Sequence, residues 1–354
     1  MTNKIKIILA GAWLHPMYEE ASCYALQNLG AEVIPYNWGH LYKRPLFRFE
    51  VKYSIKGPSL YKLNKDLINR VYKNKPDMLI IWLGSPIFPE ILEEIKQNTN
   101  VKLLSYVHDD PFSHHFHKLS PSYYKRHWRF LQSSLKFYDI ALFSKQLNVD
   151  DAYHFGAKKS AVSKQYFVPN LHKPELLTQD EKEYYGCDVV FAGHFEPDGR
   201  DEYLRALSET NIKVIIYADF SWKKANMGNL PNNFKIRSRV SGTEYVKALN
   251  GAKICLSFMS KMNRDQYTTR CFEIPACGKL LVSERTDELQ KIFREDEEII
   301  FFSSQGEFVE KIQWLLDNPG LASKISEAGH RRVYKDGHDV DSRMNEILEL
   351  YSEL

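Results

Sequence analysis

Residues 265–278, DQYTTRCFEIPACG, carry the side chains of this chain that are best suited to chemistry. A polar loop ends in Thr268, Thr269 and Arg270, and we expect a short helix to follow it. Threonine is a good helix N-cap, and the free N–H groups of a helix N-terminus hold an anion such as a diphosphate. Arg270 adds a cation for phosphate oxygens, and Glu273, one turn into the helix, can accept hydrogen bonds from sugar hydroxyls. A carboxylate beside a phosphate site is what a nucleotide ribose requires.

A second polar cluster, His108, Asp109 and Asp110, follows a predicted strand at 102–107. Open α/β sheets bind ligands at the carboxyl ends of their strands, which is where acid–base residues are useful. Either aspartate can accept a proton from a hydroxyl or orient that hydroxyl. The alternative is structural, because Asp followed by Pro also favours a plain turn.

His114, His115 and His117 lie just beyond this cluster. Their spacing is not diagnostic of a metal site, and we expect them to be loop residues in a protein that needs no bound metal. The cysteines form no CxxC pair and lie in apolar contexts, which favours buried free thiols. There are five of them: Cys23, Cys187, Cys255, Cys271 and Cys277.

Two glycine turns also follow predicted strands. Gly11 ends the first strand, and Gly193 ends a strand in the second half, with Arg200 at the start of the next helix. A strand–turn–helix is a sensible place to bind phosphate, and Arg200 adds a cation there. Neither turn has the GxGxxG pattern of a dinucleotide site. The alternatives are a plain tight turn at Gly11 and a surface helix start at Arg200.

The elements that must position these groups are short apolar strands that alternate with helices. This alternation predicts an α/β protein with parallel sheets that carry helices on both faces. The expected strands are 4–10, 32–36, 77–83, 102–107, 139–144, 161–168, 188–192, 213–217, 234–237, 252–258, 279–283 and 299–302. The expected helices include 16–29, 89–96, 200–209, 242–249 and 341–354.

Length and composition fit two ordinary globular domains, since the chain has 354 residues, of which 44% are hydrophobic and 26% charged. We place the first domain at 1–170, the second at 171–338, and a helix that crosses back to the first domain at 339–354. No run approaches the roughly 18 apolar residues of a membrane span, and the N-terminus has no cleavable signal pattern. We therefore expect a cytoplasmic protein, with peripheral attachment to the inner face of a membrane left open.

Charge is distributed unevenly between the two halves. Residues 1–170 contain 23 Lys and Arg against 14 Asp and Glu, a net +9, whereas the remainder contains 25 against 31, a net −6. A basic first half predicts an acidic partner on that side, or a merely solvated basic face. Segments 42–49 and 123–130 interleave aromatic and cationic side chains, which suits base stacking or a lipid interface. The second segment also suits an amphipathic helix with its aromatic side chains packed inward.

Arg270–Gly278, RCFEIPACG, resembles the donor-binding segment of GT-B glycosyltransferases, most closely the CgeB-like group, the spore-protein glycosyltransferase-like family. The similarity covers most of the C-terminal half. Retaining GT-B families use two glutamates separated by seven residues; Glu273 matches the second, and Asp265 stands at the first position. The resemblance implies two doubly wound Rossmann-like domains facing each other across a cleft, the first on the acceptor side and the second binding a nucleotide sugar.

The implied activity is transfer of a sugar from a UDP- or GDP-type nucleotide sugar to a hydroxyl of a glycan or glycoconjugate, as in polysaccharide biosynthesis, without a metal or other cofactor. His108, Asp109 and Asp110 would act on the sugar and the acceptor, and the spacing of Asp265 and Glu273 leans slightly toward retention. The residues implied in donor binding are Gly11, Gly193, Arg200, Asp265, Tyr267, Thr268, Thr269, Arg270 and Glu273.

The identity of the acceptor stays open among an anionic glycan, a lipid-linked acceptor, another glycoconjugate and nucleic acid. Three other functions also fit the sequence. They are a sugar-nucleotide epimerase of the same fold, a non-catalytic nucleotide-sugar-binding protein, and a glycosyltransferase that acts on modified DNA.

Overall fold

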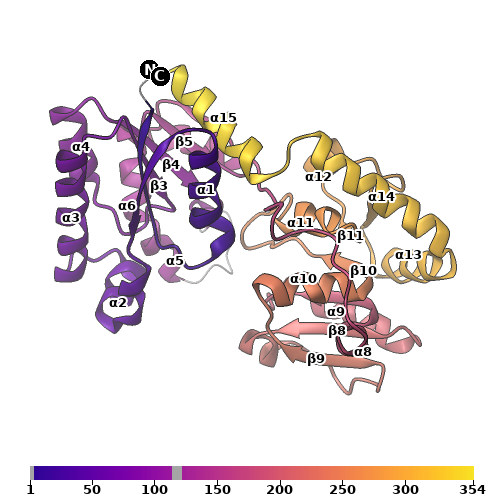
Figure 1. Ribbon diagram of the computed structural model, residues 1–354. Coiled ribbons are helices and arrows are strands. Elements are labelled where there is room, and N and C mark those ends of the chain that lie inside the picture. Colours follow the sequence, from indigo (N-terminus) through magenta and orange to yellow (C-terminus); the bar gives the residue numbers. More distant parts are fainter. Residues whose placement is uncertain (1–3, 114–121) are drawn as a thin grey trace. The chain divides into compact units, whose positions relative to one another are not determined.

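The computed structural model describes residues 4–113 and 122–354, which form two compact units. The first unit comprises the chain up to Lys164 together with Val340–Leu354, and the second comprises Gln165–Asp339. Each unit is built on a six-stranded parallel sheet (Figure 1). The predicted α/β class with two doubly wound domains is confirmed. His114, His115 and His117 lie outside the described residues.

The sheet of the first unit has the order β2-β1-β3-β4-β5-β6. Its strands are β1 (Lys6–Gly11), β2 (Glu32–Asn37), β3 (Met78–Trp82), β4 (Lys102–Val107), β5 (Ile140–Phe143) and β6 (Ser160–Val162). The predicted strand at 161–168 was too long, because β6 lies at the sheet edge and pairs only with β5, which itself ends at Phe143. The other predicted strands of this unit begin and end within two residues of the observed bounds.

Helices cover both faces of this first sheet. On one face Ile8, Ala10, Leu79 and Ile81 pack into a single large apolar cluster with α2, α3, α4 and α6. On the other face α1 packs against the C-terminal helix α15 (Figure 1). The helices of this unit are η1 (Pro16–Glu20), α1 (Ala21–Asn28), η2 (Gly39–Lys43), α2 (Pro45–Tyr53), α3 (Pro58–Asn74), α4 (Pro89–Asn98), α5 (Ser122–His127), α6 (Arg129–Ser134), η4 (Leu135–Phe137), α7 (Gln146–His154) and α15 (Val340–Ser352).

The sheet of the second unit has the order β12-β11-β10-β7-β8-β9. Its strands are β7 (Cys187–Ala192), β8 (Val214–Ala218), β9 (Phe234–Ser238), β10 (Ala252–Ser257), β11 (Leu280–Glu284) and β12 (Ile300–Phe302). Alternate residues of β7, β8, β10, β11 and β12 belong to two separate apolar clusters, with Val190 and Cys255 on one face and Val189 and Leu256 on the other. This alternation is what a sheet covered on both faces requires.

The helices of the second unit complete these two layers. They are α8 (Gln179–Tyr185), α9 (Arg200–Ala206), η5 (Leu207–Glu209), η6 (Phe220–Lys224), α10 (Gly242–Gly251), α11 (Arg270–Ala276), α12 (Asp287–Ile292), α13 (Gln305–Asp317) and α14 (Pro319–Lys335). None of the helices in the described parts of the chain is long and apolar enough to cross a membrane. All five cysteines are free and buried, as predicted.

Both strand orders contain a point where the direction of winding reverses. In the first sheet this point lies between β1 and β3, and in the second it lies between β7 and β10. All strand pairs are parallel, so the carboxyl ends of the strands share one edge in each sheet. Ligands of open α/β sheets bind outside that edge, at the point of reversal. The loops after β1, β3, β7 and β10 are therefore where a site is expected.

Candidate functional site

At the carboxyl edge of the first sheet, His108 is held by two aromatic side chains. Trp82, the last residue of β3, donates its Nε1–H to His108 Nδ1 at 3.2 Å, and the ring of Tyr18 stacks on the imidazole with centroids 4.3 Å apart. Burial lowers the pKa of His108, and the neighbouring Asp109 opposes this shift. Because Nδ1 accepts a hydrogen bond, the proton of the neutral ring lies on Nε2. His108 is therefore arranged as a neutral hydrogen-bond donor.

The two aspartates after His108 have different surroundings. Asp110 is fully buried, and its Oδ1 accepts hydrogen bonds from the Phe112 amide at 2.9 Å and from Asn148 Nδ2 at 2.8 Å. Asp109 is half-buried, and its carboxylate makes no hydrogen bond or ion pair with another residue that the structure describes. Asp110 thus holds the turn, whereas the Asp109 carboxylate is available to a substrate.

The loop after β1 closes over a buried carboxylate that the sequence analysis did not single out. Glu19, in η1, is 3% exposed, and its Oε1 accepts the Trp13 amide proton at 3.0 Å. Burial raises the pKa of Glu19, and hydrogen bonds from backbone amides, including that of Trp13, oppose the shift. A Cβ atom on Gly11 would lie 2.4 Å from Glu19 Oε1, so this position excludes a side chain. Gly11 is therefore needed for packing, and its role toward a ligand stays a prediction.

In the second unit, the predicted segments at 193–200 and 265–273 lie at the same point of the sheet edge. The guanidinium of Arg270 lies 5.9 Å from the ring centroid of Phe191, in β7. A Cβ atom on Gly193 would lie 2.8 Å from Cζ of the same ring. Lys261 Nζ also donates to the backbone carbonyl of Asp198 at 2.5 Å, which joins the loop after β10 to the loop after β7. The fold thus brings both segments to the reversal point of the second sheet.

The two arginines predicted to contact a diphosphate differ in their partners. Arg200 is 2% exposed, and its Nε and Nη2 donate to the carboxylate of Asp198, the first at 2.8 Å. Its Nη1 donates to the His194 carbonyl at 2.8 Å, and Glu196 lies 3.8 Å from Nη2. This guanidinium holds the loop after β7 together. A contact between Arg200 and phosphate stays a prediction.

Arg270, in contrast, is half-buried and has no ion pair with a carboxylate of the described residues. Its Nε is buried and has no hydrogen-bond partner there. An unpaired buried N–H group is costly, and buried polar groups without a partner are few in native proteins. The side chain is therefore prepared for an acceptor that a ligand would supply.

The prediction that a threonine side chain caps α11 was wrong. Thr269 occupies the N-cap position, but its side chain makes no capping hydrogen bond. Its backbone already has helical torsions, φ −54° and ψ −36°, whereas a capping side chain needs an extended N-cap residue. Thr268 instead lies with its Oγ1 3.2 Å from the Ser257 Oγ of β10. The amides of Thr268, Thr269 and Arg270 donate no hydrogen bond to another described residue.

Glu273 is a buried carboxylate with two partners from distant parts of the chain. It is 3% exposed, and its Oε2 accepts the hydroxyl proton of Tyr245, in α10, at 2.9 Å. Its Oε1 lies 3.7 Å from His172 Nε2. His172 Nδ1 accepts the Val168 amide proton at 3.0 Å, and burial lowers the pKa of His172 against the opposing effect of Glu273. Sequence reasoning missed Tyr245 and His172, which no local motif marks.

The remaining predicted donor residues, Asp265 and Tyr267, precede α11. Asp265 is half-buried; its Oδ1 accepts from Asn263 Nδ2 at 2.7 Å, and its amide donates to the Ser260 carbonyl at 2.9 Å. Tyr267 is 1% exposed and packs edge-on against Phe272, with ring centroids 5.8 Å apart. Asp265 thus shapes the loop, and Tyr267 belongs to the core beneath it.

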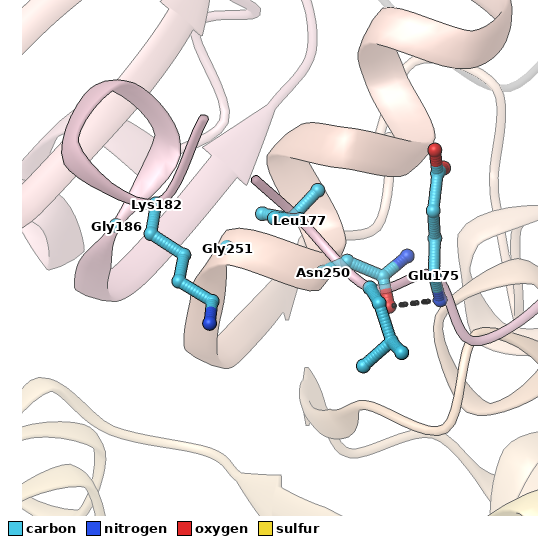
Figure 2. A pocket seen from close by; sticks show the side chains of 7 residues that line it. Glu175, Leu177, Lys182, Gly186, Asn250 and Gly251 are labelled. Atoms are coloured by element: carbon cyan, nitrogen blue, oxygen red, sulfur yellow. Dashed lines mark hydrogen bonds between the residues drawn. The ribbon is translucent and has the colours of Figure 1, made fainter. Parts of the chain in front are cut away.

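A hollow of about 270 Å³ lies elsewhere on the second unit. Figure 2 shows side chains that line it. Gly186 immediately precedes β7, and Gly251 immediately precedes β10, so this hollow lies at the amino ends of the strands. In Figure 2 the dashed line is the hydrogen bond from the Glu175 amide to Asn250 Oδ1, 3.1 Å long. The hollow is therefore at the opposite sheet edge from Arg270.

No group of three or more His, Cys, Asp or Glu side chains within 4–113 and 122–354 is placed to hold a metal ion.

Comparison with known proteins supports the fold. A family described as "Glycosyl transferase-like" matches residues 200–349, whereas no curated protein matches the sequence. Among solved structures, the sucrose-phosphate synthase of Thermosynechococcus elongatus superposes with a TM-score of 0.71 at 13% identity, over 99% of both chains. Anabaena HepE, solved in complex with UDP, gives 0.67 at 13% identity, over 99% of this chain and 100% of that one.

A third similar structure is an α-glucosyltransferase in complex with UDP and a 13-mer DNA that contains a HMU base. It gives a TM-score of 0.62 at 13% identity and covers 99% of this chain and 100% of that one. At such identities the likeness establishes the fold, which is that of the GT-B glycosyltransferase structures.

Proposed function

We propose that this chain is a glycosyltransferase that transfers a sugar from a nucleotide-diphosphate sugar to a hydroxyl group. The observation that carries the proposal is the pairing of Arg270 and Glu273 at the reversal point of the second sheet. Arg270 has a buried Nε without a described partner, and Glu273, one turn further, is a buried carboxylate. The family match at residues 200–349 spans both residues, and the similar HepE structures contain UDP and UDP-glucose.

On the donor side, we assign Arg270 to the diphosphate and Glu273 to the ribose. Arg270 can supply the Nε–H and a terminal N–H to phosphate oxygens and stabilise the charge that develops as the diphosphate leaves. Tyr245 occupies Oε2 of Glu273 and His172 Nε2 lies 3.7 Å from Oε1, so we assign the remaining lone pairs of the carboxylate to ribose hydroxyls. Gly193 keeps the end of β7 free of a side chain. A UDP-type donor is our first choice of substrate.

On the sugar side, we assign His108 and Asp109 as the reacting pair of the first unit. The neutral His108 offers Nε2–H to a sugar hydroxyl, because its Nδ1 is already bound to Trp82. The Asp109 carboxylate, free of partners among the described residues, accepts the acceptor proton or orients the acceptor hydroxyl. Asp110 holds the turn that carries both side chains. The spacing of Asp265 and Glu273 keeps a slight preference for retention of configuration.

The acceptor class is proposed more broadly, as a glycan or glycoconjugate, with an anionic or lipid-linked form favoured by the basic first half. A DNA acceptor is the second candidate, because one similar structure is an α-glucosyltransferase bound to DNA. Transfer of labelled sugar to duplex DNA with modified bases, against transfer to glycan and lipid-linked acceptors, separates the two.

The first experiment is thermal unfolding of the purified protein with a panel of nucleotides and nucleotide sugars. A ligand present at a hundred times its dissociation constant stabilises by roughly 2.7 kcal/mol. We expect this stabilisation with one donor, and its loss in Glu273→Gln. Glu298→Gln is the matched control, because Glu298 is 4% exposed and ion-paired but precedes β12, at the amino edge of the sheet.

Each result of this experiment has a separate meaning. No stabilisation by any nucleotide would contradict the donor site. Stabilisation that Glu273→Gln and Glu298→Gln both retain would place the nucleotide elsewhere. Stabilisation without transfer to any acceptor or hydrolysis of the donor would favour a non-catalytic binding protein, and conversion of the free nucleotide sugar to its epimer would favour an epimerase.

A further inference from the structure

Helix α2 exposes large apolar side chains beside cations. Its inner face carries Phe47 and Val51, which are at most 2% exposed, whereas Leu46 and Phe49 on the outer face are each 52% exposed. The ring of Phe49 packs against that of Tyr53, one turn further along α2, with centroids 5.0 Å apart. Single exposed apolar side chains are common, but neighbouring exposed apolar side chains that are bordered by polar groups mark an interaction surface. We call Leu46, Phe49 and Tyr53 the outer stripe of α2.

Cations border this stripe on both sides. Arg48 and Lys52 are exposed one turn apart on α2, and Lys52 Nζ lies 5.3 Å from the Tyr53 ring centroid. On the other side, the guanidinium of Arg126, in α5, lies 5.9 Å from the same ring. Ser54 Oγ, just after α2, donates to the Arg126 carbonyl, which fixes α5 beside α2.

Neither α2 nor α5 presents an exposed carboxylate on this surface. Residues 43–53 contain four Lys and Arg, all exposed, and one acidic residue, Glu50. Glu50 is 1% exposed, and its Oε2 accepts the Leu60 amide proton at 3.0 Å, so its charge is directed into the protein. With Lys125 and Arg126 from α5, six cations surround an apolar stripe. A cluster of four to eight cations beside an amphipathic helix is the sequence-level signature of binding to anionic lipid.

Helix α2 also belongs to the edge of the sheet that carries His108. The chain leaves the carboxyl end of β2 and passes directly over the loop after β1, where a Cβ atom on Gly39 would lie 1.9 Å from the Ala12 carbonyl oxygen. The ring of Tyr42, in η2, then packs edge-on against Phe47 with centroids 5.1 Å apart. The outer stripe is therefore connected to the acceptor side of the first unit through packed residues.

We propose that the outer stripe of α2 and its bordering cations dock the protein on the surface of an anionic lipid bilayer. Leu46 and Phe49 enter the boundary between headgroups and acyl chains, while Arg48, Lys52 and Arg126 bind lipid phosphates. A nucleic acid would use the cations and the aromatic rings, but it offers no favourable place for the aliphatic Leu46. This inference concerns binding alone and does not depend on the proposed activity.

The test is co-sedimentation of the full-length protein with vesicles of phosphatidylcholine, with and without phosphatidylglycerol. We expect binding only to the vesicles that contain phosphatidylglycerol, and weaker binding as salt is added. Arg48→Gln together with Lys52→Gln should weaken the partition roughly thirtyfold, since each cation near such a surface contributes about a factor of five. Phe49→Ser should weaken it about tenfold, because a buried Phe contributes at least this much.

A matched pair of controls lies in η6 of the second unit. Phe220 is 82% exposed and is followed by the exposed Lys223 and Lys224. Phe220→Ser, and Lys223→Gln with Lys224→Gln, change the same residue types outside the proposed surface and should bind vesicles like the wild type. Melting curves of all variants identify any that fail to fold.

Three outcomes would overturn the proposal. The first is wild-type protein that does not sediment with phosphatidylglycerol vesicles. The second is a loss in the η6 variants as large as that in the α2 variants. The third is binding to a short fluorescent DNA duplex that Arg48→Gln with Lys52→Gln abolishes and Phe49→Ser leaves intact, which would identify a nucleic-acid surface.

Discussion

Arg200 and Arg270 stand in similar sequence contexts, after a strand and at the first position of a helix. The structure nevertheless predicts opposite effects when each is replaced by methionine, which keeps most of the apolar stem and removes the charge. Arg200→Met leaves the buried Asp198 carboxylate, 9% exposed, without its bidentate partner, while Glu196 keeps His194 Nε2 at 2.6 Å. Removal of one partner from a buried ion pair costs about 3–5 kcal/mol.

Arg270→Met, in contrast, removes a buried Nε–H that has no acceptor among the described residues. Removal of this unpaired N–H group should stabilise the nucleotide-free protein by at most about 1–3 kcal/mol, because Arg270 is only half-buried. The lost cation–π contact with Phe191, at 5.9 Å, costs about 0.5–1 kcal/mol. The nucleotide-free variant should therefore unfold at the wild-type temperature or slightly above it.

The assay is thermal unfolding of the wild type and both variants, with and without the stabilising nucleotide. For a domain of this size, each kcal/mol corresponds to roughly 2–4 °C, so Arg200→Met should melt about 6–20 °C lower. Arg270→Met should keep its stability but bind the nucleotide about ten- to a hundredfold more weakly, because a charged hydrogen bond contributes about 1.5–3 kcal/mol. The reasoning is refuted if Arg270→Met is strongly destabilised without nucleotide, or if Arg200→Met melts with the wild type.

Three further predictions concern the residues around these sites. Asp109→Asn should slow transfer about a hundredfold or more in transfer assays, at unchanged melting temperature. Asp110→Ala should lower the stability measured by urea unfolding by about 1–3 kcal/mol for each hydrogen-bond donor left unpaired. Trp82→Phe removes the donor to Nδ1 of His108; we expect transfer to slow about two- to twelvefold and ¹⁵N NMR to show mixed imidazole tautomers instead of one. Because burial lowers the folded-state pKa of His172 below its unfolded value near 6.5, the unfolded chain binds more protons just below that pH. The stability advantage of the wild type over His172→Gln, measured by urea unfolding, should thus be full above pH 6.5 and fall as the pH drops toward the folded-state pKa; an advantage that is constant from pH 7.5 to 5.5 would contradict this.

The strands of both sheets could be predicted from the sequence because each is a short apolar run bounded by turn residues. The strand at 78–82 is buried at every position, because both faces of the sheet are covered. Such a strand appears in the sequence as an uninterrupted apolar run, which is easy to recognise. Helices α2 and α3 were not predicted as elements, because residues 43–74 are rich in cations and aromatic residues that interrupt the apolar pattern of a helix. Their buried residues, such as Phe47 and Leu60, follow the helical period but are spaced among charges.

The candidate site was only partly predictable, and the reason is the range of the interactions. A sequence motif contains only residues that are close along the chain. The predicted strands before His108 and Arg270 were therefore enough to place both residues at the carboxyl edge of a sheet. Partners from distant segments leave no local pattern. Glu273 contacts Tyr245 and lies near His172, which are 28 and 101 residues away, and Trp82 reaches His108 from the neighbouring strand.

The charge balance of the donor site limits what the second unit can bind. Asp198 neutralises Arg200, so Arg270 remains as the cation with no described carboxylate, and a diphosphate brings more than one negative charge. Lys261 Nζ is bound to the Asp198 carbonyl, and its charge acts on the half-buried carboxylate of Glu284, whose pKa it lowers against the raising effect of burial. The amides of Thr268 and Thr269, which donate to no described residue, add further partial positive charge. An arginine without a described carboxylate and a few free amides suit the charged oxygens of a diphosphate, and this match supports the nucleotide-diphosphate sugar that we propose as donor.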